Sequence, residues 1–240
     1  MKVLNDILGY DNLKIYQDLD YFCFSLDSVI LANFCSIRLR DKKICDMGTG
    51  NGVIPLILSK RTDKKIVGVE IQKNLYELAV ESVSYNKLED QIILIHDDVG
   101  NLSFHEEFDL VTCNPPYFPV HEQSYFNEQE EKMIARHEVK LNLDKMFSVA
   151  SKILKNNGNF AMVHRTERIM EILSVMRKYH IEPKKIVFIH EKLDKESTLV
   201  FIEGQKCGNV GLKIEAPFIM YQEDGSMTKE YETLTKEVRK

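Results

Sequence analysis

Seven short apolar runs rich in β-branched residues alternate along this chain with longer segments of helical periodicity. Such short runs indicate strands that are buried on both faces of a sheet. The expected strands are 43–47, 65–70, 91–96, 108–113, 159–164, 185–190 and 198–205, and the expected helices are 53–60, 73–87, 143–155 and 167–178. Alternation over about 150 residues predicts βαβ units, and hence a doubly wound parallel sheet of the α/β class.

The ends of the last expected elements carry two further predictions. Thr166 precedes the helix 167–178, and a threonine there is a favourable N-cap. The last two strands are separated only by the polar stretch 191–197, which leaves no room for a crossover helix. They are therefore expected to form an antiparallel hairpin at one edge of the sheet.

A cluster of three glycines follows the first expected strand, in the segment Asp46-Met47-Gly48-Thr49-Gly50-Asn51-Gly52. Glycine lets the backbone turn sharply and approach a ligand closely, and the helix after the cluster offers free N–H groups. The spacing is not G-x-G-x-x-G, so a pyrophosphate-binding dinucleotide site is disfavoured. Asp46 would repel a phosphate and attract an ammonium group, which points to a different class of ligand.

Acidic residues also stand at the ends of the next two strands, where open α/β sheets bind ligands. Glu70 is placed to accept hydrogen bonds from the two hydroxyls of a ribose, and Asp97 and Asp98 from the amino group of an adenine. An ammonium group, a ribose and an adenine without phosphate describe S-adenosylmethionine (SAM). The acids and glycines therefore predict a SAM site.

These residues resemble the glycine motif of class I SAM-dependent methyltransferases, over roughly Asp27 to Gln205. The resemblance implies a Rossmann-like fold with a seven-stranded, mostly parallel sheet of order 3-2-1-4-5-7-6, whose last strand is antiparallel. We expect a lead-in over 1–25, a methyltransferase domain over 26–220, and a polar tail over 221–240 that ends in a helix.

The tetrapeptide Asn114-Pro115-Pro116-Tyr117 follows the fourth expected strand. Two consecutive prolines stiffen the loop, and the side chain of Asn114 and the backbone of Pro115 each supply a carbonyl acceptor. Two acceptors on a rigid frame suit the two hydrogens of an exocyclic NH2 group, while Tyr117 offers a face on which a base can stack. This predicts direct methyl transfer from SAM to the amine, leaving S-adenosylhomocysteine, with no metal and no covalent enzyme intermediate.

The same tetrapeptide resembles the [D/N/S]-P-P-[Y/F/W] signature of methyltransferases that act on nitrogens of planar systems. The resemblance implies catalytic roles for Asn114, Pro115, Pro116 and Tyr117, and it fixes the reaction class without fixing the substrate. Ribosomal-RNA guanine-N2 methylation, protein-glutamine N5 methylation and a SAM-binding RNA module without turnover remain alternatives. The extra domains that usually accompany DNA, release-factor and guanine-N2 enzymes are not expected here.

Residues 17–32 resemble the lead-in of the bacterial tRNA1(Val) (adenine(37)-N6)-methyltransferase family, although Asp20 and Cys23 replace a glycine and an arginine of that family. The resemblance implies that three residues border the methionine end of SAM: Phe24, Ser25 and Asp27. From the residues alone, Asp27 equally fits an N-cap of the next helix, and both interpretations stay open.

Two further segments, 135–138 and 163–168, also resemble that family. The resemblance implies an RNA-contacting set: Tyr117, Arg136, His137, Arg165 and Arg168. Guanidinium groups suit phosphate contacts, but solvated charges at helix starts are an open alternative, and His164 equally fits a hydrogen-bonded strand-end histidine. The implied reaction is N6-methylation of adenine 37 beside the anticodon of a tRNA, where an exposed loop base needs little unstacking.

Composition is consistent with this interpretation. The formal net charge is -5, but residues 89–131 hold 11 acids and no Lys or Arg, whereas 132–195 hold 14 basic residues and seven acids. The basic segment is expected to carry the RNA backbone, with binding that weakens as salt rises. No apolar run would span a membrane, no signal peptide is recognisable, and neither cysteines nor histidines have metal spacing. A reduced cytoplasm is the expected compartment.

Overall fold

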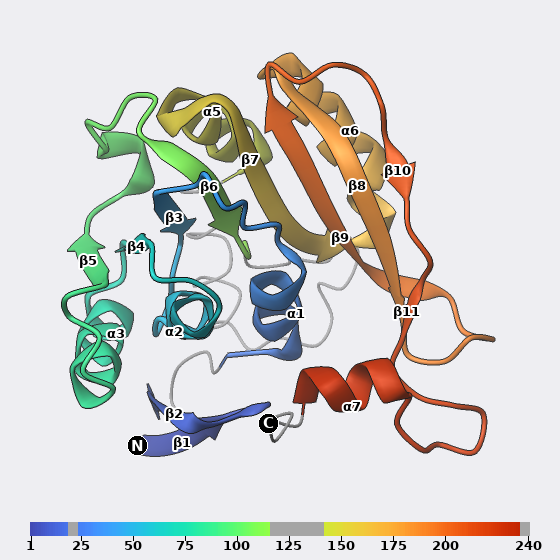
Figure 1. The fold of residues 1–240 in the computed structure, drawn as a ribbon, viewed down its shortest axis with the longest axis horizontal. Coiled ribbons are helices and arrows are strands. Elements are labelled where there is room, and N and C mark those ends of the chain that lie inside the picture. Colours follow the sequence, from blue (N-terminus) through green and yellow to red (C-terminus); the bar gives the residue numbers. More distant parts are fainter. Residues whose placement is uncertain (19–23, 116–141, 236–240) are drawn as a thin grey trace, which may run out of the picture.

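The computed structural model of the chain describes residues 1–18, 24–115 and 142–235, and its centre is one twisted sheet (Figure 1). From one edge the strands are β5 (Ile92–His96), β4 (Lys65–Glu70), β3 (Lys43–Met47), β6 (Phe108–Cys113), β7 (Leu154–Arg165), β9 (Ser197–Lys206) and β8 (Ile181–His190). Neighbours are parallel except β9, which is antiparallel to both β7 and β8. This confirms the expected strand order and the α/β fold class. Among the described residues the sheet has nine strands rather than the expected seven, because two short strands, Lys213–Ile214 and Phe218–Ile219, also pair with β8.

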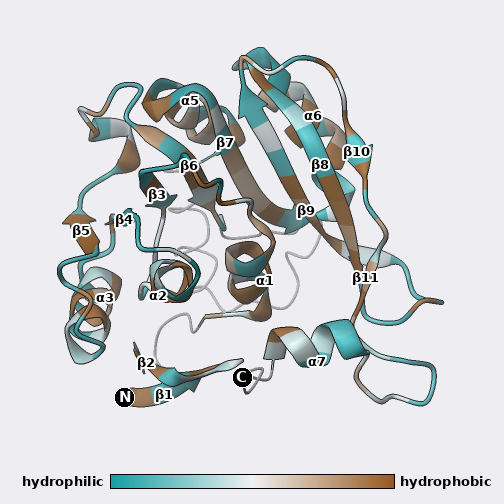
Figure 2. Ribbon diagram, in the orientation of Figure 1, coloured by the Kyte–Doolittle hydropathy of each residue, from teal (hydrophilic) through white to brown (hydrophobic). Residues whose placement is uncertain are grey.

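Helices cover both faces of the sheet because its strands are apolar on both sides. On one face pack α1 (Leu26–Phe34) and α2 (Val53–Arg61), and on the other α5 (Leu143–Ile153) and α6 (Ile169–Lys178). Successive residues of β3 alternate between the two cores, Ile44 in one and Cys45 in the other. Figure 2 accordingly shows hydrophobic colour on the central strands, while the flanking helices carry both colours.

The start of α6 differs from the sequence-based prediction. A 3-10 turn, η2 (Thr166–Arg168), precedes the helix, and Arg168 occupies the N-cap position. Thr166 is therefore not the cap. Its hydroxyl lies 3.1 Å from the Ser197 hydroxyl at the start of β9, a partner that local sequence cannot reveal.

An N-terminal hairpin was not predicted. It consists of β1 (Lys2–Ile7) and β2 (Tyr10–Asp18), and it packs on α3 (Lys73–Tyr85). Leu13 and Ile15 of β2 are fully buried, and the Tyr16 backbone N–H donates to the Ser82 hydroxyl of α3 at 2.9 Å. The alternation of polar and apolar residues in this segment is the period of a half-buried strand, so the signal was present.

The C-terminal part adds short strands beside β8 and a helix near the hairpin. Strands β10 (Lys213–Ile214) and β11 (Phe218–Ile219) pair in parallel with β8, and α7 (Lys229–Thr235) comes after them. Tyr231 of α7 is buried and packs edge-on against Phe218 and Tyr221. The hairpin and α7 lie at the same end of the molecule (Figure 1).

No helix of the described ranges has the length and hydropathy needed to cross a membrane.

The hairpin turn and α7 approach each other so closely that the turn requires glycine. Gly9 has φ +81°, and a Cβ added there would lie 2.4 Å from the Leu234 carbonyl oxygen. Gly225 has a similar φ of +85° but open space around it. We expect Gly9→Ala to lower the free energy of unfolding by clearly more than Gly225→Ala, which carries only a left-handed backbone cost of about 1 kcal/mol. Urea denaturation of both variants measures this difference, and equal losses would contradict the contact.

Candidate functional site

The glycine cluster forms a tight turn between β3 and α2. Gly48, Gly50 and Gly52 have φ values of +71°, +58° and +89°, all in the left-handed region that side chains disfavour. A Cβ at Gly48 or Gly50 would meet no atom within 4 Å, whereas one at Gly52 would lie 3.3 Å from the Ala79 Cβ. The first two glycines therefore border open space that a ligand can enter, and the third permits close packing on α3.

Glu70 ties this turn to the end of β4. One carboxylate oxygen accepts a hydrogen bond from the Gly50 N–H and the other from the Gln72 N–H, both at 2.8 Å. The side chain is almost completely buried, and burial raises its pKa although the backbone donors oppose that shift. Each oxygen keeps a second lone pair, so hydroxyl groups of a ligand can still donate to it.

Asp46 is fully buried beneath the turn with an incomplete set of partners. One oxygen accepts from the Thr112 hydroxyl at 2.7 Å, while no hydrogen bond of good geometry reaches its other oxygen or the Thr49 hydroxyl among the described residues. Burial raises the pKa of Asp46 to about 7, and the charge of Glu70 adds to the effect, while the nearby hydroxyls of Thr49 and Thr112 oppose it. A buried acceptor without a donor is costly, so this position fits a ligand or water that donates, as an ammonium group does.

Asp97 and Asp98 both take part in local structure after β5. Asp97 accepts from the Asp98 N–H at 2.7 Å and from the Asn101 amide at 2.9 Å. Asp98 caps the 3-10 turn η1 (Val99–Asn101) and forms an ion pair with Lys145 of α5, with both oxygens 2.9 Å from the ammonium nitrogen. The two acids thus anchor the loop after β5, at the same edge of the sheet as the glycine turn.

Asn114 comes directly after β6, which lies between β3 and β7 in the sheet. Cys113 pairs in parallel with Met47 of β3 and with Met162 of β7, so Asn114 stands beside the start of the glycine turn. The Asn114 side-chain amide donates to the Ser28 hydroxyl of α1 at 2.9 Å, and Pro115 is buried. Pro116, Tyr117, Arg136 and His137 lie outside the described residues.

The lead-in residues gather where β2, α1 and the glycine turn meet. The Phe24 N–H donates to the Gln17 side-chain carbonyl at 3.0 Å, and the Asn51 amide of the turn donates to the Tyr16 carbonyl at 3.4 Å. Ser25 occupies the N-cap position of α1 without capping through its side chain. Asp27 lies in the first helical turn, so the interpretation of Asp27 as the N-cap is wrong.

Three polar residues at the end of β7 differ in their burial and in their partners. His164 is buried, its Nδ1 accepts from the Arg165 N–H at 2.8 Å, and burial lowers its pKa to about 4, aided by the charge of Arg168. It is a neutral strand-end histidine near pH 7. Arg168 forms a bidentate ion pair with Glu171, with two contacts of 2.8 Å, whereas Arg165 is exposed.

Folding engages most of the basic side chains of the segment 132–195 in contacts of its own. Eleven of the 14 basic residues of 132–195 belong to the described part. Five form ion pairs (Lys145, Lys155, Arg168, Arg177 and Lys178), and four donate to backbone carbonyls (Lys152, Lys184, Lys185 and Lys192). Lys145 and Lys155 pair with Asp98 and Asp109 of the acidic stretch. Among the described residues only these two pairs reduce the segregation, and residues 142–195 still hold 11 basic residues against six acids.

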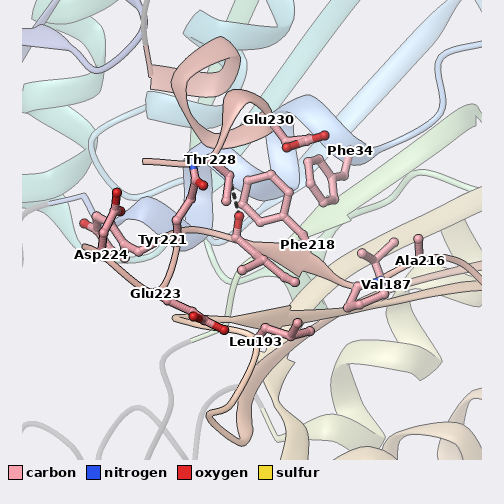
Figure 3. Close-up of a pocket in the computed structure, with 13 residues that line it drawn as sticks. Phe34, Val187, Leu193, Ala216, Phe218, Tyr221, Glu223, Asp224, Thr228 and Glu230 are labelled. Carbon is pink, nitrogen blue, oxygen red and sulfur yellow. Dashed lines mark hydrogen bonds between the residues drawn. The ribbon is translucent and has the colours of Figure 1, made fainter. Parts of the chain in front are cut away.

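A separate cavity of about 910 Å³ opens between β8, β11 and the segment leading to α7 (Figure 3). Its apolar lining includes Phe34 and Phe218, and three acids also line it: Glu223, Asp224 and Glu230. None of its lining residues belongs to the glycine turn or to Asn114. These acids would repel the phosphates of a nucleic acid, so we do not expect the cavity to hold an RNA backbone.

Sequence reasoning missed several residues that complete the site, chiefly Ser28, Thr49 and Thr112. Ser28 and Asn114 are 86 positions apart, so no local pattern links them. Thr112 lies in β6 two positions before Asn114, and Thr49 stands between two glycines, but a lone hydroxyl carries little signal in a sequence. Their neighbours in space become visible only when the strand ends are brought together.

Known proteins resemble this chain over most of its length. A family model described as the methyltransferase small domain matches residues 26–183. A tRNA1(Val) (adenine(37)-N6)-methyltransferase of Actinobacillus pleuropneumoniae serotype 7 is 28% identical over 212 residues, covering 88% of this chain and 87% of the relative. A protein of the same name from Phocaeicola vulgatus is 27% identical over 237 residues and covers 97% of both chains.

Solved structures share the fold at lower identity. A predicted O-methyltransferase from Agrobacterium tumefaciens has a TM-score of 0.70 and 19% identity, covering 87% of this chain and 95% of its own. P. horikoshii TYW2 in complex with MeSAdo has a TM-score of 0.60 and 14% identity, covering 86% and 72% respectively. These two likenesses concern the fold alone.

The raised pKa of Asp46 predicts a pH-dependent cost of folding. This carboxyl has its ordinary pKa of 3.8 in the unfolded chain and a pKa of about 7 in the folded chain. Between these two pH values the folded state binds more protons, so the free energy of unfolding falls as pH rises, and it levels off above the folded pKa. We expect Asp46→Asn to raise the melting temperature at pH 8 more than at pH 4.5. The same substitution should weaken SAM binding in calorimetry, because a neutral amide would not attract the ammonium group expected beside Asp46.

The matched control is Asp63→Asn, since Lys64 lowers the pKa of the exposed Asp63 carboxyl. That variant should show a small change of the opposite sign over the same pH range. A melting-temperature difference for Asp46→Asn that stays constant from pH 4.5 to pH 8 would contradict the buried, proton-binding state of this carboxyl.

Proposed function

The chain belongs to the methyltransferase small domain family and is a SAM-dependent methyltransferase, and we propose that it methylates the N6 amine of adenine 37, beside the anticodon of tRNA1(Val). The observation that supports this most is the placement of Asn114 at the end of β6, beside the glycine turn. The names of the relatives at 27–28% identity favour tRNA over the other amine substrates that the tetrapeptide allows.

The cofactor would be held by the residues around the glycine turn. Gly48 and Gly50 leave room for it, Asp46 offers an ammonium group an oxygen that has no hydrogen bond among the described residues, and Glu70 offers acceptor capacity to hydroxyls. We assign Phe24, Ser25, Asp27, Gly52, Asp97 and Asp98 to the border of the same pocket. When bound, SAM supplies an electrophilic methyl group.

The chain's own contribution to the reaction is orientation and electrostatic stabilisation. The Asn114 side-chain carbonyl and the Pro115 backbone carbonyl would accept the two N–H bonds of the amine and direct its lone pair. As the nitrogen forms its new bond, positive charge builds up on the NH2 group, and the two acceptors stabilise it. The proposed transfer involves no metal ion.

RNA contacts are proposed for five side chains. Arg165 is exposed at the end of β7, in the strand next to Asn114, and it suits a phosphate contact. Arg168 is already paired with Glu171, so its contribution should be smaller. Tyr117, Arg136 and His137 complete the proposed set, with Tyr117 as the stacking platform for the base. A tRNA partner places the reaction in the cytoplasm.

The decisive test is nucleoside mass spectrometry after incubation with SAM and, separately, bulk tRNA, ribosomes and a release factor. We expect N6-methyladenosine in tRNA only. A methylated guanine in ribosomal RNA or a methylated glutamine would transfer the assignment to another substrate of the same reaction class. An absence of methyl transfer to all three would contradict the proposal.

Removing the amine acceptor should abolish turnover and spare cofactor binding. We expect Asn114→Ala to lower kcat by about 100-fold or more, since one preorganised hydrogen-bond partner of a charge-developing group is worth that much. SAM affinity, measured by calorimetry, should stay close to that of the parent. Asn209→Ala is the control, an exposed asparagine far along the chain, and near-normal turnover of Asn114→Ala would refute the assigned role.

A phosphate contact at Arg165 should appear as a salt effect. Arg165→Ala is expected to raise the KM for tRNA and to reduce by about one the slope of log affinity against log salt concentration. Arg168→Ala should change both quantities less, because Glu171 already neutralises that guanidinium. Filter binding from about 50 to 300 mM salt gives the slopes, with the exposed Arg40→Ala as control. Identical slopes for Arg165→Ala and the parent would contradict the contact.

A further inference from the structure

We propose that Ser28 is a positioning residue that orients the Asn114 amide, so that its nitrogen faces α1 and its carbonyl oxygen faces the substrate amine. The inference rests on the proposed role of Asn114 as an amine acceptor. It assigns a function in the reaction to a helix whose other residues are mainly core residues.

The contact that carries the inference is short and sheltered. The Asn114 Nδ2 donates to the Ser28 hydroxyl at 2.9 Å, and Ser28 is only 6% exposed. The carbonyl oxygen and the nitrogen of a side-chain amide leave the same planar carbon in different directions. A hydrogen bond that fixes the nitrogen therefore also fixes the direction of the oxygen.

The orientation matters because the two ends of the amide have opposite chemistry. An amine substrate presents N–H donors, so only the carbonyl oxygen of Asn114 can hold it. With the amide turned over, the NH2 group of Asn114 would meet the NH2 group of the base, donor against donor. In the arrangement that the structure shows, the Ser28 hydroxyl accepts from the amide nitrogen and leaves the carbonyl oxygen on the opposite side. Turning the amide over would require this hydroxyl to donate instead of accept.

Ser28 can do this because α1 is anchored along its length. Residues 29–32 are fully buried against the sheet, which leaves the helix no freedom to rotate. At its C-terminal end the Arg61 guanidinium donates to the carbonyls of Ala32 and Cys35, and the Lys185 ammonium donates to the Phe34 carbonyl at 2.9 Å. The hydroxyl of Ser28 therefore has a fixed position relative to β6.

The hydrogen bond can be tested without any substrate, by NMR of the 15N-labelled protein. The Asn114 side-chain NH2 signals are identified by their loss in Asn114→Asp. We expect these protons to exchange with solvent at least tenfold faster in Ser28→Ala than in the parent, and at a near-parental rate in Ser28→Thr, which keeps the hydroxyl. An exchange rate that is unchanged in Ser28→Ala would overturn the inference.

The consequence for turnover is tested by kinetics on the tRNA substrate. Ser28→Ala should lower kcat by tenfold or more, while SAM affinity in calorimetry and the melting temperature change little, and Ser28→Thr should restore most of kcat. Ser59→Ala, which removes a helix hydroxyl of α2 bonded to the Leu56 carbonyl, should leave kcat unchanged. A kcat within twofold of the parent in Ser28→Ala would overturn the positioning role.

The two measurements separate this inference from the proposed function. A parent protein that transfers no methyl group to tRNA refutes the proposed substrate, and the NMR exchange rates then decide alone whether Ser28 orients Asn114. A methylated tRNA combined with a Ser28-independent kcat refutes the inference and leaves the proposed function standing.

Discussion

The parallel pairing of β3 with β4 on one side and β6 on the other is the constraint on which the rest of the site depends. Because parallel strands end at the same edge, this pairing aligns Met47, Val69 and Cys113 side by side. The groups at the three strand ends then share one space: the glycine turn, Glu70 and Asn114. The neighbouring strand β7 delivers Arg165 to the same edge. The chemistry of the site is thus set by strand register, and each loop contributes one group to it.

Hydrogen bonds hold the site in place, but the burial of two of its carboxyl groups lowers the stability of the fold. Glu70 is buried and accepts two backbone donors, which keeps the turn in its left-handed conformation, while Asp46 keeps one oxygen without a partner among the described residues. Such incomplete pairing is typical of a site prepared for a ligand, because the ligand supplies the missing interactions. Contacts farther from the glycine turn are stabilising. Arg61 and Lys185 anchor α1, and the Lys145–Asp98 ion pair joins α5 to the loop after β5.

Much of the sheet was predictable because its strands are short, apolar and separated by strong turn signals. The expected ranges 43–47, 65–70 and 108–113 coincide with β3, β4 and β6. The N-terminal hairpin was missed because its alternating pattern is weaker than a continuous apolar run. The N-cap assigned to Thr166 was wrong because its hydroxyl pairs with Ser197, 31 positions away. The contacts of the site residues were not predictable, since their hydrogen-bond partners are distant in sequence.

By itself the sequence determined the class of fold, the place of the glycine turn and the presence of a two-acceptor Asn-Pro unit after the fourth strand. Those features depend on local periodicity and on residues with restricted backbone geometry, which act over a few positions. Only the tertiary structure decided which charges neutralise one another, that His164 is buried and neutral, and that Ser28 meets Asn114. The physical reason is that burial, ion pairing and amide orientation depend on neighbours in space, and strand order rather than chain order supplies those neighbours.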